Sequence, residues 1–354
     1  MAVLYEEQSM LRDMAREWAV NESPVNAWRK VRDAGLDFDA SKWAEMGQMG
    51  WAGIIVPEEF GGTDFGWMSL GLVVEELGKT LTASPLVASS LAASAIALGG
   101  SQAQKEKYLP QLASGELIGT LAFDEGSRHR GAVAEASVLG GKLSGTKSFV
   151  HEANGAGLFV VLASDGVYLV EKGEGVSVSD RELVDRRDHA EVTFASAPAE
   201  KLADGSDNLA DEILDRARIL TAAEMLGMAQ YVFDTTLAYL KQRVQFNQVL
   251  STFQALQHRM AGLYTDLELM RTAVEAGLTA LDTGFKVPEA ACLAKARSND
   301  VLHLMSREGV QLHGGVGMTD EYDVGFYLKR ARVLEASWGG SGFLKDRHAK
   351  LNGY

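Results

Sequence analysis

The feature that most constrains the fold of this chain is a pair of long segments with apolar stripes. A polar link that carries an arginine joins them. Residues 213–245 are apolar on nearly every side between Ile219 and Phe233, which is typical of a helix enclosed in a bundle. In the second segment, apolar residues recur at steps of four and three. They are Leu256, Met260, Leu263, Leu267, Met270 and Val274. This spacing predicts the seam of a helical bundle in the C-terminal part of the chain.

The first 117 residues are also expected to be helical, because they lack the alternation of a strand. Apolar residues recur at helical spacing up to Ser23-Pro24, where the proline disfavours a continuing helix. Ser41 is predicted to cap the next helix. Further helices are predicted at residues 67–79, 83–99 and 102–113.

The pattern changes after Leu117. From there to about Phe194 the chain has short runs rich in valine, phenylalanine, threonine and tyrosine. Glycine-containing turns at 139–142 and 164–166 separate several of these runs. Short strands with such turns predict a small antiparallel β domain. The predicted strands are residues 117–123, 132–139, 142–149, 158–163, 167–171 and 192–194.

Helical patterns return after the β region and continue to the end of the chain. Pro288 is expected to open a helix, and Gly314-Gly315 to stop it. Residues 322–354 are predicted to form one last, more polar helical stretch. The chain is therefore predicted to be α+β and mostly α.

Charge and cysteine content exclude some classes of function. The formal net charge of −14 argues against a nucleic-acid binder, which needs a basic face. Seven histidines are scattered without the spacing of metal ligands, so no metal site is predicted. No apolar run is long enough to cross a membrane. The single cysteine, Cys292, and an N-terminus without signal-like features lead us to expect a cytoplasmic protein.

The link Arg243–His258 combines one fixed cation, several amides and the two rings of Phe246 and Phe253. A guanidinium binds phosphate oxygens through two parallel hydrogen bonds. Amides can pair with both the donors and the acceptors of a heterocycle. The link is thus suited to a phosphorylated aromatic cofactor, and the alternative is a plain polar connection between two helices.

The link resembles the flavin-binding signature of the acyl-CoA dehydrogenase family, in which Arg-x-Gln-Phe precedes Phe-Gln-x-x-Gln-His. Four further stretches resemble the family, in the family's order along the chain. They are Val-Pro-Glu-Glu-Phe-Gly-Gly at 56–62, Val-Glu-Glu-Leu-Gly at 74–78, Gly-Thr-Lys-Ser-Phe-Val at 145–150 and Gln-Leu-His-Gly-Gly-Val-Gly at 311–317. Because these stretches cover nearly the whole chain, it is identified as a member of that family.

The resemblance implies three domains. These are a helical N-terminal domain (1–117), a central antiparallel β domain (118–205) and a C-terminal four-helix bundle (206–354). It also implies flavin-adenine dinucleotide (FAD) as cofactor, an acyl-CoA thioester as substrate and α,β-dehydrogenation as the reaction. An electron-transfer flavoprotein is the expected electron acceptor.

The resemblance also assigns residues of the link to FAD. The family's matching arginine reaches an FAD bound in the neighbouring subunit, and this role falls to Arg243. Phe246, Phe253 and Gln254 match its companions. Asn247 stands where the family usually has glycine, which is tolerable because asparagine adopts positive φ more readily than most residues.

Two other stretches are assigned to the flavin by resemblance. Gln311, Gly314 and Gly315 are expected at a neighbouring chain's FAD, where two glycines let a pyrophosphate approach the backbone. Phe149 and His151 are expected beside the flavin ring. His151 replaces a hydroxyl residue of many relatives and can donate a comparable hydrogen bond to the flavin. The alternative for His151 is a surface residue at the end of a strand.

The family's catalytic glutamate has no counterpart at either of its usual positions. One of these positions falls on Gly339 and the other on Ala217, and neither residue carries a carboxylate. Glu335 and Glu224 are weak candidates for the base. Structural roles are expected for both, Glu335 as an i, i+4 partner on a charged helix and Glu224 as a buried hydrogen-bonded group.

The missing glutamate leaves several hypotheses open. Residues 317–330 are similar to a pattern in bacterial heteromeric acyl-CoA dehydrogenases of steroid degradation, which are α2β2 assemblies. The first hypothesis is therefore a subunit whose base comes from a second acyl-CoA dehydrogenase chain. A self-sufficient homo-tetramer, a non-catalytic scaffold and a flavin monooxygenase are the alternatives.

Overall fold

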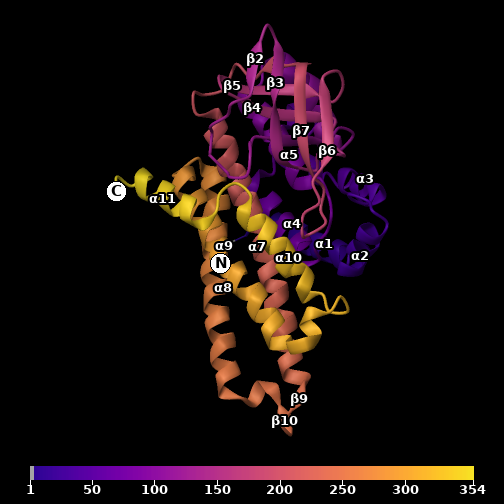
Figure 1. Ribbon diagram of the computed structural model, residues 1–354, viewed down its shortest axis with the longest axis vertical. Coiled ribbons are helices and arrows are strands. Elements are labelled where there is room, and N and C mark those ends of the chain that lie inside the picture. Colours follow the sequence, from indigo (N-terminus) through magenta and orange to yellow (C-terminus); the bar gives the residue numbers. More distant parts are fainter. Residues whose placement is uncertain (1–3) are drawn as a thin grey trace. The chain divides into compact units, whose positions relative to one another are not determined.

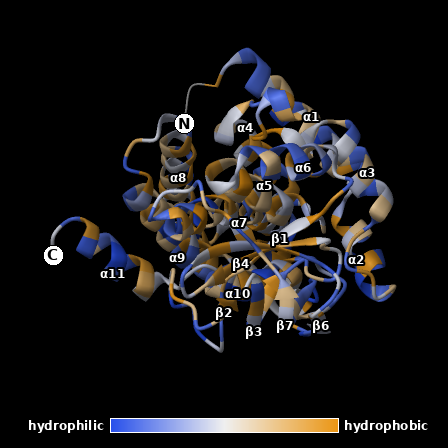
Figure 2. Cartoon of the chain, turned by 90° about the horizontal axis from the view of Figure 1, so that it is seen from above, coloured by the Kyte–Doolittle hydropathy of each residue, from blue (hydrophilic) through white to orange (hydrophobic). Residues whose placement is uncertain are grey.

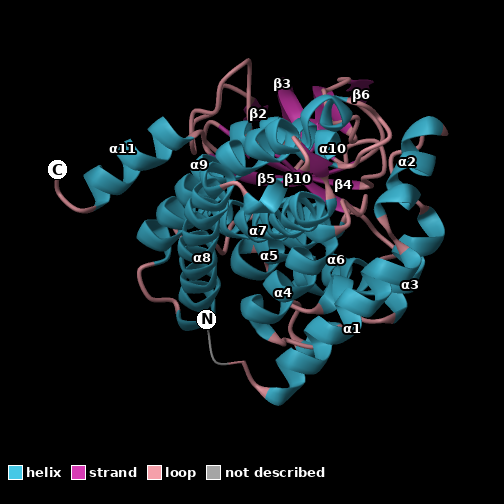
Figure 3. Ribbon diagram, turned by 90° about the horizontal axis from the view of Figure 1, so that it is seen from below, coloured by secondary structure: helices cyan, strands magenta, loops and turns pink. Residues whose placement is uncertain are grey.

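A computed structural model describes residues 4–354, and helices form most of the chain (Figures 1 and 3). The first three residues of the predicted N-terminal domain lie outside the described residues. The α-helices are α1 (Glu6–Glu22), α2 (Val25–Asp33), α3 (Ala40–Gln48), α4 (Gly66–Lys79), α5 (Leu86–Gly99), α6 (Gln102–Ser114), α7 (Leu209–Gln242), α8 (Gln254–Thr283), α9 (Val287–His313), α10 (Val324–Ala336) and α11 (Ser341–Leu351). Short 3-10 turns are η1 (Trp51–Gly53), η2 (Glu58–Phe60), η3 (Leu250–Thr252) and η4 (Gly314–Met318).

The start of α3 differs from the prediction. Asp39, not Ser41, occupies the N-cap position, and its carboxylate accepts hydrogen bonds from the backbone N–H groups of Ser41 and Lys42. A carboxylate at this place also interacts favourably with the positive end of the helix dipole. By contrast, α1 ends directly before Ser23-Pro24, as predicted.

The β region forms two four-stranded sheets. The strands are β1 (Gly119–Ala122), β2 (Ser137–Leu139), β3 (Lys142–His151), β4 (Leu158–Ala163), β5 (Gly166–Glu171), β6 (Val176–Asp180), β7 (His189–Pro198) and β8 (Glu200–Lys201). One sheet has the order β1-β4-β5-β8 and the other β2-β3-β7-β6. The predicted antiparallel domain is confirmed, with the exception that β1 runs parallel to β4.

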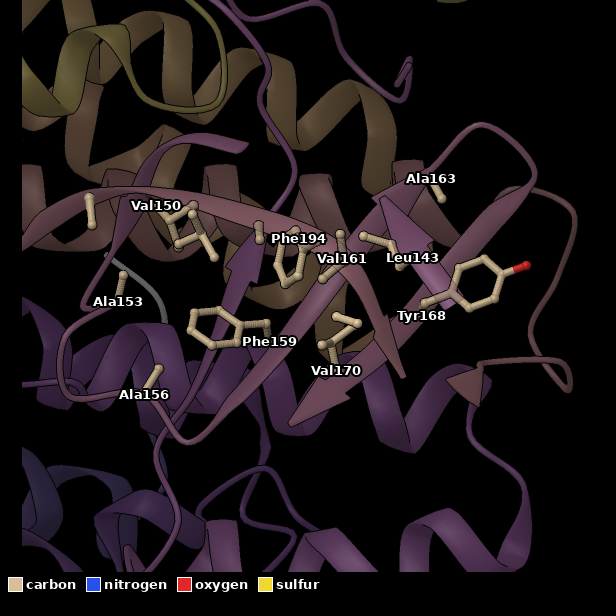
Figure 4. Close-up of a cluster of buried hydrophobic side chains, with 14 residues drawn as sticks. Leu143, Val150, Ala153, Ala156, Phe159, Val161, Ala163, Tyr168, Val170 and Phe194 are labelled. Atoms are coloured by element: carbon tan, nitrogen blue, oxygen red, sulfur yellow. The ribbon is translucent and has the colours of Figure 1, made fainter. Parts of the chain in front are cut away.

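The core of the β region lies between the two sheets. The rings of Phe159 on β4 and Phe194 on β7 meet edge to face, with centroids 6.0 Å apart (Figure 4). Helix α5 covers β1, and Gly119 permits this approach because a Cβ there would lie 2.5 Å from Cβ of Ala92. The β region is therefore packed on both faces of its first sheet, which explains the fully buried strand β4.

The C-terminal helices pack as the sequence predicts. A Cβ at Gly277 of α8 would lie 3.2 Å from Ile219 of α7 and 3.3 Å from Ala294 of α9, so α8 contacts both neighbours closely. The prediction of one helical stretch over 322–354 was wrong, because a turn at 337–340 separates α10 from α11. Trp338 has φ +59° in this turn, a conformation that no helix contains. Helix α11 is largely hydrophilic (Figure 2).

The chain divides into two compact units. The first comprises Met1–Asn26, Gly71–Thr82 and Arg218–Tyr354, and the second comprises Ala27–Leu70 and Ala83–Ala217. Helix α1 is tied to the first unit by an ion pair between Arg16 and the buried Glu76, 3.2 Å apart. The domain boundaries at 117 and 205 stay a prediction.

Candidate flavin and acyl-CoA site

The residues that follow α7 form a tight hairpin in the first unit. Strands β9 (Val244–Gln245) and β10 (Gln248–Val249) pair antiparallel around a two-residue turn (Figure 1). Both turn residues have positive φ, Phe246 at +54° and Asn247 at +63°. Two positive φ values are those of a type I′ turn, whose twist matches that of the two strands. Asparagine is favoured in this turn. The conformation expected for Asn247 is thus observed.

Phe246 is unusual at this place. Its side chain is 84% exposed, and an L-residue in the left-handed region costs about 1–2 kcal/mol. Its ring meets only the edge of Phe253, with centroids 6.1 Å apart. Strain at an exposed aromatic residue is more typical of a binding site than of a fold determinant.

The polar residues predicted around this turn are exposed as well. Arg243 directly follows α7, and Gln254 is the first residue of α8. The first turn of α8 presents backbone N–H groups and the positive end of the helix dipole. The hairpin and this helix start thus offer a cation, an amide and N–H donors for an anionic ligand.

The end of α9 lies next to the end of α7. The ring of Tyr239 stacks on His313, and its hydroxyl donates to the carbonyl oxygen of His313 at 3.3 Å. Tyr239 is one helical turn before Arg243, and His313 directly precedes Gly314. The fold therefore places the two predicted cofactor motifs on adjacent helix ends. Sequence reasoning missed this stack, although the aromatic residue at i−4 from Arg243 was a signal for it.

The imidazole of His313 is buried. Burial lowers its pKa, opposed by the hydrogen bond that Nδ1 donates to the carbonyl oxygen of Gly309 at 2.8 Å. Gly314 then turns away at φ +68°, where glycine is favoured. Gln311, Gly314 and Gly315 are exposed, and no heavy atom lies within 4 Å of a Cβ built on either glycine.

The second unit contains a distorted strand, which carries the other two residues assigned to the flavin. The pairing of β3 with β7 shifts between Lys147 and Val150, and Phe149 there has φ +54° and is 41% exposed. Such a bulge re-aims a side chain out of the regular sheet. Beneath it, Nζ of the buried Lys147 donates to Glu125 at 2.6 Å. Burial opposes the charge on Glu125, but this bond and two backbone N–H groups hold the pKa of its carboxyl below the usual value.

His151 lies at the end of β3, where Thr120 donates to its carbonyl oxygen at 2.5 Å. Its ring contacts the ring of His189 on β7, with centroids 4.4 Å apart. The neighbouring Asp188 is buried and accepts a hydrogen bond from the backbone of Asn154. Burial, together with the charge of nearby Asp37, raises the pKa of Asp188 to about 7. Phe149 and His151 thus lie two residues apart at the end of β3, with Phe149 exposed and His151 half-buried against His189.

The whole chain matches proteins of one family. Residues 5–116 match the acyl-CoA dehydrogenase N-terminal domain, and residues 205–350 match the C-terminal domain. A short-chain specific acyl-CoA dehydrogenase of Clostridium acetobutylicum is 32% identical, over 96% of both chains. The chain belongs to the acyl-CoA dehydrogenase family. As a member, it is an oxidoreductase that acts on the CH–CH bond of an acyl-CoA.

Other members of the family are similar along the same length. Acyl-CoA dehydrogenase IpdE2 of Mycolicibacterium smegmatis is 29% identical over 92% of both chains. Among solved structures, the Tcur3481-Tcur3483 steroid ACAD variant aligns with a TM-score of 0.92, at 29% identity and 98% of both chains. An acyl-CoA dehydrogenase of Geobacillus kaustophilus aligns with a TM-score of 0.89, at 26% identity and 99% of both chains. The fold expected from the family is confirmed.

The two positions assigned to the family glutamate, Ala217 and Gly339, differ in their surroundings, and neither residue has a carboxylate. Ala217 is fully buried in α7. Gly339 lies in the turn between α10 and α11 with φ +113°, a conformation that side-chain-bearing residues rarely adopt. Residues 336–344 read Ala-Ser-Trp-Gly-Gly-Ser-Gly-Phe-Leu and contain no acid. The backbone at this turn is thus adapted to glycine.

The two candidate carboxylates in the first unit are ion-paired. Glu224 accepts from Nε of Arg330 at 2.9 Å and from a second guanidinium nitrogen at 3.3 Å. Glu335 pairs with Arg332 at 2.8 Å and with His303 at 3.2 Å. Glu335 is thus paired with a residue three positions before it and not at the predicted spacing of four, and Glu224 is hydrogen-bonded but only partly buried.

Residues 4–354 offer neither a cluster of metal ligands nor a membrane-spanning helix. No cluster of three or more histidine, cysteine, aspartate or glutamate side chains in this range has the arrangement of a metal site. No helix in the same range combines the length and the apolar character needed to span a bilayer.

Proposed function

We propose that this chain is an FAD-binding subunit of an acyl-CoA dehydrogenase whose catalytic carboxylate comes from another chain. One observation carries the proposal. Arg243, Gln254 and the motif of Gln311, Gly314 and Gly315 are exposed in the first unit. The turn at 336–344, in contrast, has no acid and has φ +113° at Gly339. A self-sufficient enzyme needs both a flavin site and a catalytic carboxylate.

The residues present fit FAD. Arg243 supplies a guanidinium for phosphate, and Gln254 and Gln311 supply amides. Among the described residues, nothing beyond its chain neighbours lies within 4 Å of a Cβ built on Gly315, which leaves room for an external group to approach the backbone. FAD accepts hydride in this class of reaction, and the role of this chain is to bind and orient it.

The reaction defines what is missing. α,β-Dehydrogenation removes a proton from Cα of the thioester and a hydride from Cβ, so that a C=C bond forms. The proton needs a base within hydrogen-bond reach of Cα. Glu224 and Glu335 are each held by an arginine, so either would have to leave its ion pair in order to accept that proton. A carboxylate from a partner chain meets the requirement without this rearrangement.

A bulky steroid-derived acyl group is the proposed substrate class. The steroid ACAD variant is similar over 98% of this chain, and residues 317–330 resemble the heteromeric enzymes of that type. An electron-transfer flavoprotein is the proposed acceptor, in agreement with the expectation from the family.

The test is anaerobic mixing of the chain, purified alone with its flavin, with a panel of acyl-CoA thioesters that includes steroid-derived ones. We expect no bleaching of the flavin band until the complex from the native cell, or its second subunit, is supplied. Bleaching by the isolated chain would show a self-sufficient enzyme. A colourless chain that co-purifies with no acyl-CoA dehydrogenase subunit would favour the non-catalytic alternative.

A further inference from the structure

Two fully buried cations lie beneath the turn that joins α10 to α11. Lys295 of α9 and Arg218 of α7 each have 0% of their surface exposed. Nε of Arg218 donates to the carbonyl oxygen of Trp338 at 3.0 Å, and Nζ of Lys295 donates to that of Leu334 at 2.9 Å. Since charged groups removed from water need hydrogen-bond partners, Arg218 is directed at the backbone of this turn and Lys295 at the last part of α10 just before it.

Lys295 also determines the orientation of Asn299, one helical turn further along α9. Nζ of Lys295 donates to Oδ1 of Asn299 at 2.6 Å. An ammonium group has donors only, so the amide must present its oxygen to Lys295. Its Nδ2 then points the other way and donates to the carbonyl oxygen of Gly339 at 3.3 Å. Lys295 thus orients the amide of Asn299, and this amide holds the carbonyl group of Gly339.

The turn needs such support because its backbone is strained. Trp338 has φ +59° and Gly339 has φ +113°, and neither value occurs in a helix. Conformations of this kind persist only where surrounding contacts over-determine them. The turn also borders an open pocket lined by Asn299, Glu335, Gly340 and neighbouring residues.

We propose that Lys295 is a positioning residue, which sets the carbonyl of Gly339 through Asn299 and so fixes the turn at residues 337–340. This turn carries the position that relatives give to their base. The inference goes beyond the proposed function and does not depend on where the base comes from.

The charged groups around Lys295 make its action dependent on pH. Burial lowers the pKa of Lys295 to about 7, Glu335 of α10 opposes this, and Arg218 acts in the same direction as burial. Because burial disfavours the charged form, loss of the proton from Lys295 favours the state in which its side chain is enclosed. His303 of α9 hydrogen-bonds to Glu335 and is therefore the neighbouring side chain that the test controls for.

The test is hydrogen–deuterium exchange of the peptide covering 336–342 in the full chain. Lys295→Met removes the donor, and Asn299→Asp keeps the shape but presents no N–H to Gly339. We expect at least tenfold faster exchange of this peptide in both variants, with little change in α8. Ser298→Ala is the matched control, because Ser298 is equally buried on α9 and its hydroxyl has no hydrogen-bond partner in the described structure.

Wild-type protein supplies a second measurement if a variant fails to fold. After correction for intrinsic exchange, protection of 336–342 should rise between pH 6 and 8.5, because the lowered pKa of Lys295 means that loss of its proton favours the closed turn. His303→Gln should keep this dependence. A purely structural role would leave protection independent of pH. The proposal is overturned by unchanged exchange in Asn299→Asp, by equally fast exchange in Ser298→Ala, or by a pH dependence that disappears with His303.

Discussion

The ring of Tyr239 stacks on the imidazole of His313, with centroids 4.4 Å apart and planes 29° from parallel. This pair joins the end of α7, which leads into Arg243, to the end of α9, which leads into Gly314. Two motifs that lie about 70 residues apart in sequence thereby become one surface of the first unit. Substitutions at residues of this surface test whether it binds a dinucleotide.

Arg243→Lys should weaken FAD binding by about 10-fold or more. Lysine keeps the charge but loses the two parallel hydrogen bonds that a guanidinium makes with phosphate, and hydrogen bonds to charged groups contribute about 1.5–3 kcal/mol. Flavin content after gel filtration and titration of the apoprotein with FAD measure the effect. Lys241→Gln, an exposed cation in the last turn of α7, should bind FAD as the wild type does. Equal losses in both variants would indicate a general charge effect.

Phe246→Gly should separate binding from stability. Glycine adopts the φ of +54° without strain, so we expect the free energy of unfolding to change by no more than about 1 kcal/mol. Truncation of a buried ring costs about 3–5 kcal/mol by comparison. FAD affinity should nevertheless fall, because the exposed ring is lost. Asn247→Gly relaxes the same turn and should retain FAD, so loss of flavin there would argue against a direct role for the Phe246 ring.

Glu224→Gln should destabilise the fold by about 1–3 kcal/mol while the complex keeps its activity. The substitution leaves Arg330 largely buried without its carboxylate, which costs stability even though the pair is partly solvated. Glu335→Gln should likewise retain flavin reduction in the purified complex. Rapid mixing with acyl-CoA measures both. Loss of reduction in one variant, with FAD still bound, would identify that glutamate as the base.

Lys295→Met should change how stability depends on pH. The pKa of Lys295 is lowered from 10.5 to about 7 in the folded state, so between these values the unfolded chain binds the additional proton. Wild-type stability therefore rises with pH in this window, by about 1.4 kcal/mol per unit relative to the variant. Below pH 7 the difference should be constant. Urea unfolding at pH 7.5, 8.5 and 9.5 gives the slope, and parallel curves would show that Lys295 titrates normally.

Asp188→Asn should show the opposite sign. The raised pKa of about 7 means that the folded state binds the additional proton between pH 3.8 and 7. Wild-type stability attributable to this group therefore falls as pH rises through that window, and the asparagine variant should not show this fall. Thermal unfolding at pH 5 and pH 8 compares the two proteins. Asp180→Asn, a more exposed acid of the same neighbourhood, is the control.

Local patterns made much of the fold predictable. Helical periodicity marks burial on one face, so α7, α8 and the break before Pro24 follow from residue order alone. The positive φ of Asn247 could be anticipated because it depends on the residue and its turn. The cap at Asp39 was missed because two neighbouring residues compete for one N-terminus, and only the path of the chain decides between them.

The sequence by itself determined the order of helices and strands, the family motifs and the lack of an acid at 336–344. Each of these depends on residues close together in the chain. Only the tertiary structure decided the stack of Tyr239 on His313, the parallel pairing of β1 with β4 and the path from Lys295 through Asn299 to Gly339. These contacts join residues tens of positions apart, and they arise because the packing of whole elements, which no local periodicity encodes, brings particular side chains together.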